Sequence, residues 1–268
     1  MNKQNSKITP LKDIKDFSFL EEFTFDYNSE QYDIKYLHYT SEKSLEKIQE
    51  ESFQKWVLYF VDKMKEFIPN NSEIIDIGAY DGDTSIPLSI MAGKKGRCIN
   101  FECGPAWHRL HINSALNKNL NLENYNFAAS HTYGIDQFNY NDDVGGSNHK
   151  TSQIGHYPLK RFVRTIDIND FLSNLNLSNL SLIKIDTEGF DVQILNLMEK
   201  YVDKFRPIIH IEWFPTTEKE LYNFLITKNY SSVDFYKLKL FDVLPDYWIQ
   251  DIMLIPKEKI DNFKTLVK

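Results

Sequence analysis

Residues 74–85 combine an apolar run with two glycines and three aspartates, which indicates a ligand-binding turn. The run Ile74–Ile77 predicts a buried strand, and Gly78 and Gly82 allow the backbone after it to approach a ligand closely. In an α/β sheet, nucleotide-type ligands bind where such a strand ends and a helix begins. Acidic side chains there would repel a phosphate and attract a cation. The candidate ligand contacts are Asp76, Gly78, Ala79, Tyr80, Asp81, Asp83, Thr84 and Ser85.

The glycine spacing argues against a dinucleotide-binding turn. The glycines follow G-x-x-x-G, whereas a dinucleotide site needs the closer pair of G-x-G-x-x-G so that a pyrophosphate can lie on the backbone. S-adenosylmethionine carries an ammonium, a sulfonium and no phosphate, so an acidic turn suits it. An NAD-dependent sugar dehydrogenase is the alternative from another enzyme class, and a binding protein that retains the fold without catalysis is a further alternative.

A second acidic position follows the next predicted strand. Glu102 comes directly after Cys98–Phe101, where a carboxylate can accept hydrogen bonds from both ribose hydroxyls of an adenosine. NAD sites use the same arrangement, so Glu102 alone does not separate the two cofactors. The third predicted strand, Tyr125–Ala128, would bring Asn126 and Phe127 near the adenine.

Charged residues at the ends of two later strands are the candidates for catalysis. Lys184 lies two residues before Asp186 and shares its face of the fourth strand. Its candidate partners in a buried ion pair are Asp186, Glu188 and Glu212. His210 and Glu212 alternate onto one face of the fifth strand and can point toward Asp186. His210 with Asp186 and Glu212 could remove a hydroxyl proton or hold a divalent metal, and Glu188 and Glu212 could orient the base or bind substrate hydroxyls. The alternative for His210 is a histidine satisfied within the core.

Strands that alternate with helices predict an α/β fold with a doubly wound, mostly parallel seven-stranded sheet of Rossmann-like type. No helix separates the last two strands, so we expect them to form a C-terminal antiparallel hairpin. The predicted strands are Ile74–Ile77, Cys98–Phe101, Tyr125–Ala128, Leu182–Ile185, Pro207–Glu212, Ser231–Tyr236 and Asp251–Ile255. The predicted helices are Thr84–Met91, Pro105–Asn117, Thr165–Leu175, Phe190–Met198 and Glu218–Lys228.

The chain divides into an N-terminal extension, residues 1–72, and a main domain, residues 73–268. The extension is rich in aromatic residues and should pack on the core with a helix over about 41–67, for which Ser41 is a plausible N-cap. Glycines and a proline interrupt the alternation at about 130–164 and predict an inserted flap over the active site. His149 in this flap could reach a substrate.

Composition excludes several classes of protein. The net charge of -7 and pI of about 5.5 oppose a nucleic acid partner, which needs a basic surface. Cys98 and Cys103 lack metal-ligand spacing and are expected to be reduced thiols. No apolar run is long enough to span a membrane and no signal peptide is evident, so we expect a cytoplasmic protein. The sequence is compatible with a homo-oligomer.

These motifs together resemble the FkbM-type S-adenosylmethionine-dependent methyltransferases, a class I methyltransferase family. The resemblance covers roughly residues 73–256, and its most specific part is the Lys-x-Asp-x-Glu-Gly pattern at 184–189 combined with the first turn. The motifs that carry it are Asp76-Ile-Gly-Ala-Tyr-Asp-Gly82, Phe101-Glu102-Cys-Gly-Pro105, Asn113, Phe127-Ala-Ala-Ser130, Gly145-Gly-Ser147, Arg164-Thr-Ile-Asp167-Asn-Asp-Phe-Leu172, Lys184-Ile-Asp186-Thr-Glu188-Gly189 and His210-Ile-Glu212.

The resemblance implies cofactor contacts for Asp76, Gly78 and Glu102. Members of the family mostly methylate hydroxyls of sugars and natural products, so it implies an O-methyltransferase whose substrate is a nucleotide-activated sugar of capsule or other surface polysaccharide biosynthesis. It does not decide whether Asp186 or His210 is the base. In the alternative, a Mg²⁺-type ion held by Asp186 and Glu212, with or without His210, assists methylation of a non-sugar natural product.

Overall fold

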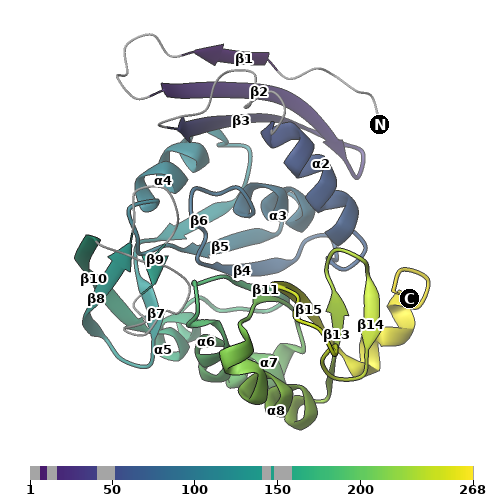
Figure 1. Cartoon of the computed structure of the whole chain (residues 1–268). Coiled ribbons are helices and arrows are strands. Elements are labelled where there is room, and N and C mark those ends of the chain that lie inside the picture. The colour runs from purple at the N-terminus through teal and green to yellow at the C-terminus, as the bar shows by residue number, and fades with distance from the viewer. Residues whose placement is uncertain (1–6, 11–16, 41–51, 141–145, 148–158, 268) are drawn as a thin grey trace.

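The computed structural model describes residues 7–10, 17–40, 52–140, 146–147 and 159–267 of the chain (Figure 1). Its centre is an eight-stranded sheet in the order β14-β13-β15-β12-β11-β4-β5-β6. The strands from β12 to β6 in this order are parallel, whereas β15 is antiparallel to both β12 and β13. The strands of this sheet are β4 Glu73–Ile77, β5 Arg97–Phe101, β6 Leu122–Tyr125, β11 Leu180–Ile185, β12 Ile208–Glu212, β13 Tyr230–Asp234, β14 Lys239–Phe241 and β15 Asp251–Pro256.

Two details of the predicted sheet differ from the structure. The sheet has eight strands rather than seven, because the short edge strand β14 lies between β13 and β15 in the sequence, where the sequence analysis saw only a connection. The third strand is Leu122–Tyr125 rather than Tyr125–Ala128. Ala128 instead begins β7, a strand of another sheet, so the last residue of the predicted strand belongs to a different sheet.

The central strands are buried on both faces, because helices cover both faces of the sheet. Ile74 and Leu182 pack in one apolar cluster with α2 and α3, whereas their neighbours Ile75 and Ile183 pack in a second cluster with α5, α6, α7 and α8. The helices are α2 Phe53–Met64, α3 Ser85–Ala92, α4 Trp107–Leu116, α5 Ile168–Ser173, α6 Asp191–Leu197, α7 Glu199–Phe205 and α8 Glu218–Lys228, with 3-10 turns at Pro215–Thr217 and Lys257–Phe263.

The described part of the N-terminal segment contains an antiparallel sheet that the sequence analysis did not predict. It consists of β1 Lys7–Pro10, β2 Phe17–Tyr27 and β3 Glu30–Thr40, in that order. β3 lies against α4 (Figure 1), where Asn113 Oδ1 accepts a hydrogen bond from Leu37 N at 2.8 Å and Asn117 Oδ1 accepts one from Lys35 N at 2.9 Å. The hairpin is thereby tied to the helix that follows β5.

The helix predicted over about 41–67 corresponds, within the described residues, to α2. Ser52 is its N-cap, and its side chain accepts a hydrogen bond from Lys55 N at 3.3 Å. The earlier N-cap candidate, Ser41, lies outside the described residues. Across the part of the chain that the structure describes, no helix has the length and apolar character needed to cross a membrane.

The predicted flap contains a four-stranded sheet in the order β7-β10-β8-β9. β8 and β10 pair antiparallel, with Thr165 opposite Gly134. The helix predicted over Thr165–Leu175 is shorter, because β10 continues to Asp167 and Asp167 then caps α5 by accepting from Asn169 N and Asp170 N. The strands are β7 Ala128–Ser130, β8 Gly134–Tyr140, β9 Gly146–Ser147 and β10 Leu159–Asp167.

Candidate active site

A cavity of about 540 Å³ opens at the carboxyl ends of the parallel strands. This is the edge where an α/β sheet binds its ligands. Residues from the turn after β4, from the end of β5, from the loop after β11 and from β12 all contribute to one continuous wall. The wall includes Trp56, Phe60, Gly78, Tyr80, Asp83, Thr84, Phe101, Glu102, Arg109, Phe127, Phe138, Lys184, Asp186, Thr187, Glu188, His210, Phe235, Tyr236 and Asp251.

Gly78 allows β4 and β11 to end side by side. Its φ is +82°, and a Cβ at this position would lie 1.7 Å from the carbonyl oxygen of Asp186. No larger residue fits there without moving the backbone that carries Asp186. The first turn and the loop after β11 both line the cavity, and they can lie in contact because residue 78 is a glycine.

Asp76 lies beneath the turn and outside the cavity wall. It is fully buried, and its Oδ2 accepts hydrogen bonds from Ser85 Oγ at 2.7 Å and Thr84 Oγ1 at 3.2 Å. Its other oxygen, Oδ1, lies 3.5 Å from Lys184 Nζ. Asp76 thus fixes the start of α3 relative to β4, and Ser85 also acts from below the turn.

Two aromatic residues from the N-terminal segment hold the turn from outside. Tyr36 of β3 donates a hydrogen bond from its hydroxyl to Asp81 Oδ1 at 2.6 Å, and Trp56 of α2 donates from Nε1 to the carbonyl of Asp83 at 3.0 Å. Asp81 points toward β3 rather than into the cavity, whereas Asp83 lines the cavity. The density of aromatic residues in this segment indicated that it is ordered, but no spacing in the sequence could show that Tyr36 reaches Asp81.

Replacing Tyr36 with phenylalanine is expected to weaken cofactor binding without unfolding the chain. The change leaves the buried Asp81 carboxylate without its hydroxyl donor, at a cost of about 1–3 kcal/mol, and loosens the turn. We expect a higher Kd for S-adenosylhomocysteine by isothermal titration calorimetry. Tyr222→Phe is the matched control, because Tyr222 is 47% exposed on α8 and lies away from the turn. An unchanged Kd in Tyr36→Phe would contradict this role.

Glu102 lines the cavity and supports the turn at the same time. Its Oε2 accepts from Tyr80 N at 2.9 Å and its Oε1 from Gly104 N at 2.5 Å, which leaves each oxygen with a further lone pair. Burial is the main cause that raises the pKa of Glu102, to about 7, and the two backbone N–H groups oppose it. Phe127 lines the cavity beyond it. Asn126 is exposed and outside the wall, and it donates to the carbonyl of Glu102 at 2.8 Å.

The raised pKa of Glu102 predicts that the affinity for the cofactor falls as the pH is lowered. Hydroxyl donors bind best to the ionised carboxylate, and a pKa of about 7 leaves about a tenth of it ionised at pH 6. The Kd for S-adenosylhomocysteine should therefore rise about tenfold from pH 8 to pH 6. Glu102→Gln should remove this dependence. Burial and repulsion from Asp81 also raise the pKa of Asp83 to about 7, so a dependence that persists in Glu102→Gln would assign the titration to Asp83.

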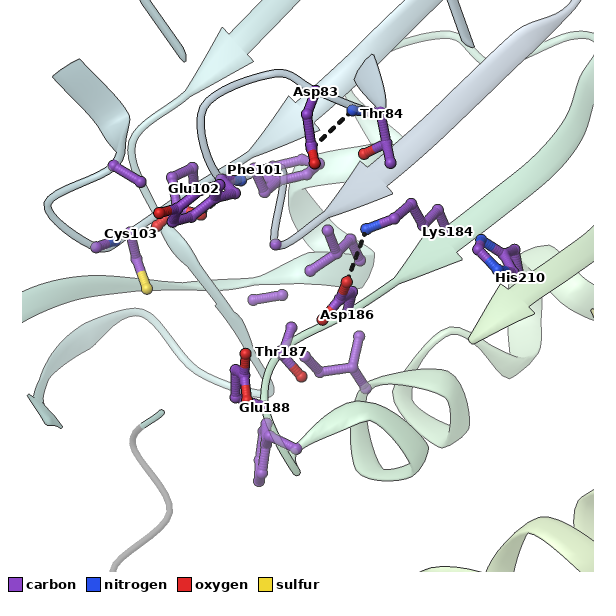
Figure 2. A pocket seen from close by; sticks show the side chains of 18 of the residues that line it. Asp83, Thr84, Phe101, Glu102, Cys103, Lys184, Asp186, Thr187, Glu188 and His210 are labelled. Carbon is purple, nitrogen blue, oxygen red and sulfur yellow. Dashed lines mark hydrogen bonds and ion pairs between the residues drawn. The ribbon is translucent and has the colours of Figure 1, made fainter. Parts of the chain in front are cut away.

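Lys184 lies in a polar row that crosses the sheet. In the strand register it stands between Asp76 of β4 and His210 of β12. Its ammonium group lies 3.5 Å from Asp76 Oδ1 and points toward Asp186, 3.3 Å from Oδ2 (Figure 2). These carboxylates outweigh burial and raise the pKa of Lys184, so the ammonium stays charged. The predicted partner Asp186 is confirmed, and Asp76 is a second partner that the sequence analysis did not propose.

His210 lines the cavity beside this charged row. The side chain is 5% exposed, and neither ring nitrogen has a hydrogen-bond partner in the described part of the chain. Its Nε2 lies 3.9 Å from Asp251 Oδ1, and the rings of Phe60 and Phe235 surround it. Burial lowers the pKa of His210, which favours the neutral imidazole. A neutral ring with an unpartnered nitrogen can accept a proton.

The loop after β11 carries the remaining acidic residues. Asp191 at the start of α6 accepts hydrogen bonds from Thr187 N at 2.6 Å and Gly189 N at 2.9 Å, which fixes the loop. Asp186 and Glu188 both line the cavity, and their carboxylates lie within 4.8 Å of that of Glu212. Burial, followed by repulsion from Asp186, raises the pKa of Glu212 to about 9. The predicted candidate His149 lies outside the described residues.

The comparisons with known proteins agree with this geometry. The family model described as "Methyltransferase FkbM domain" matches residues 76–235, more than half of the chain. The chain belongs to the FkbM methyltransferase family. This match favours a methyltransferase over the NAD-dependent dehydrogenase that the position of Glu102 had left open. No curated protein matches the chain.

Several solved structures match this FkbM-family chain at low sequence identity. The FkbM methyltransferase of Methylobacillus flagellatus KT has 13% identity and a TM-score of 0.45, with 77% of this chain and 59% of that chain covered. A putative rRNA methylase of Clostridium thermocellum has 10% identity and a TM-score of 0.45, with 74% and 92% covered. The TrmK protein of M. capricolum, in complex with S-adenosylhomocysteine, has 12% identity and a TM-score of 0.40, with 74% and 66% covered. This chain thus spans about three fifths of the FkbM structure's length.

Proposed function

We propose that this protein is an S-adenosylmethionine-dependent O-methyltransferase that acts on a sugar hydroxyl, with a nucleotide-activated sugar of surface polysaccharide biosynthesis as the expected substrate. One observation carries the proposal. A single cavity joins the turn after β4 and Glu102 to His210 and Asp186, so a cofactor and a proton acceptor can meet in one space. The family match supports methyl transfer as the reaction.

The residues on the β4–β5 side of the cavity fit S-adenosylmethionine. Glu102 retains lone pairs for ribose hydroxyls, and Phe101 and Phe127 offer apolar surface to an adenine. Asp83 places a carboxylate in the wall, where a cationic group would be favoured. When bound, S-adenosylmethionine supplies an electrophilic methyl group.

The opposite side of the cavity fits a hydroxyl substrate. His210 offers an unused ring nitrogen that can take the hydroxyl proton as the oxygen attacks, and Asp186 is held in place by Lys184. Trp56 and Tyr236 present aromatic surface in the same wall, where the faces of a sugar ring can stack. This combination of aromatic rings and carboxylates is what supports a sugar rather than a wholly apolar substrate.

The substrate is tested by incubating the full chain with S-adenosylmethionine and a panel of nucleotide-activated sugars. Mass spectrometry should find one sugar that gains the mass of one methylene, and fragmentation should place the methyl on an oxygen. A methylated nitrogen, or a product only on a non-sugar hydroxyl, would contradict the proposed substrate class. If the chain binds the cofactor but methylates no sugar of the panel, the proposal that the sugar is carried on a nucleotide would be contradicted.

A further inference from the structure

We propose that Asp186, Glu188 and Glu212 form a binding site for one hard divalent cation of the Mg²⁺, Mn²⁺ or Ca²⁺ type. Each residue offers a carboxylate oxygen, and these oxygens lie within 4.8 Å of one another. Oxygens that share a Ca²⁺ ion at about 2.4 Å lie at most about 4.8 Å apart, so the spacing of these three is compatible with one shared ion. Of the residues that the sequence analysis considered for a metal, His210 does not belong to this group.

The backbone holds these carboxylates together from two adjacent strands. Asp186 and Glu188 come from one loop and both point toward the cavity (Figure 2). Glu188 adopts a left-handed φ of 57°, and Asp191 fixes the loop around it through Thr187 N and Gly189 N. Glu212 ends β12, the strand that pairs with β11. The arrangement is therefore built by the fold and does not depend on an exposed loop alone.

Glu212 provides independent evidence that a partner is needed. Its side chain is only 4% exposed, and its Oε1 accepts from Gln250 Nε2 at 2.5 Å. Its Oε2 is buried and has no hydrogen-bond partner among the described residues. Leaving a buried polar atom without a partner costs about 1–3 kcal/mol, and more for a charged group. A cation between Glu212 and the other two carboxylates would supply the missing interaction.

The ammonium group of Lys184 does not already serve as the cation for these three carboxylates. Its ammonium lies 3.3 Å from Asp186 and 3.5 Å from Asp76, so its charge is divided between two carboxylates, one of them beneath the turn. In the described part of the chain, Lys184 forms no salt bridge with Glu188 or Glu212. A ligand set made only of oxygen favours Mg²⁺, Mn²⁺ or Ca²⁺ over Zn²⁺, which prefers nitrogen and sulfur.

The role of the ion rests on the proposed methyl transfer, although its binding does not. Three carboxylates leave coordination positions open, and hydroxyl oxygens of a substrate could take them. The ion would then orient the substrate near His210 and favour the alkoxide that forms when the proton leaves. This gives the acidic residues of the loop after β11 a function distinct from that of the base.

The site is tested with Mn²⁺ alone, added to the full chain without cofactor or substrate and followed by electron paramagnetic resonance. We expect one bound Mn²⁺ per chain. Glu212→Gln and Glu188→Gln should each weaken binding by at least about tenfold, because each replaces a charged ligand by a neutral one. Glu220→Gln is the matched control, since Glu220 is exposed on α8, and it should bind Mn²⁺ as the unaltered chain does.

Two results would overturn the proposal: no Mn²⁺ binding at millimolar concentration, or binding that neither glutamine substitution changes. Circular dichroism melts identify a variant that has not folded. If Glu212→Gln does not fold, Glu188→Gln still tests the site, because Glu188 is only partly buried. S-adenosylhomocysteine binding is measured on the same samples. Cofactor binding without Mn²⁺ binding would reject the cation site and leave the methyltransferase proposal intact. Mn²⁺ binding without cofactor binding would support the cation site and contradict the methyltransferase proposal.

Discussion

Replacing His210 with asparagine is expected to lower kcat by about 10²–10⁴-fold, which is the usual contribution of a positioned general base. The imidazole lines the cavity with both ring nitrogens unpartnered in the described structure, and burial keeps it neutral. Asparagine retains a polar side chain but cannot accept the proton. Because His210 lies away from Glu102 and the first turn, the Kd for S-adenosylhomocysteine should stay within about twofold.

The measurement is kcat on the methylated substrate together with calorimetric cofactor binding. His131→Asn is the matched control, because His131 is exposed and does not line the cavity. If His210→Asn keeps its turnover and Asp186→Asn loses it, the carboxylate is the base and the assignment to His210 is wrong. If both variants keep turnover, neither residue removes the proton.

Replacing Lys184 with methionine is expected to lower the free energy of unfolding by about 3–5 kcal/mol, because the change breaks a buried ion pair. Asp76 is fully buried, and Lys184 is the cation beside its Oδ1. Methionine keeps most of the volume but leaves that carboxylate uncompensated. Urea denaturation followed by circular dichroism measures the change. Lys219→Met on the exposed surface of α8 should change stability by less than about 0.5 kcal/mol.

A double-mutant cycle separates the ion pair from simple packing. Adding Asp76→Asn to Lys184→Met removes the uncompensated charge while the amide oxygen can still accept from Ser85, so part of the lost stability should return. Simple additivity of the two substitutions, or a loss below about 1 kcal/mol in Lys184→Met, would show that the pair contributes little.

The central α/β sheet could be predicted because its signals are local. Apolar runs such as 74–77 and 208–212 are buried on both faces, and the glycines and acids directly follow them. The positions of Glu102, Lys184, Asp186 and His210 in one cavity followed from the rule that parallel strands end at one edge. The family resemblance was confirmed by a family model that matches residues 76–235.

Other features depended on contacts between distant parts of the chain. Leu122–Tyr125 is only partly buried and gave no strong strand signal, so the third strand was placed three residues too late. The hydrogen bond from Tyr36 to Asp81 joins residues 45 positions apart and has no local signature. The sequence also suggested ligand contacts for three polar residues of the turn, Asp76, Asp81 and Ser85. Only the structure shows that their side chains support the turn from below or outside the cavity.

The cavity is expected to bind S-adenosylmethionine between the first turn and Glu102. Titration of the full chain with S-adenosylhomocysteine in a calorimeter at pH 8 tests it most directly. We expect one binding site per chain, a rise in Tm with ligand, and loss of binding in Glu102→Ala. An absence of both binding heat and thermal shift at millimolar ligand, with a folded chain, would contradict it.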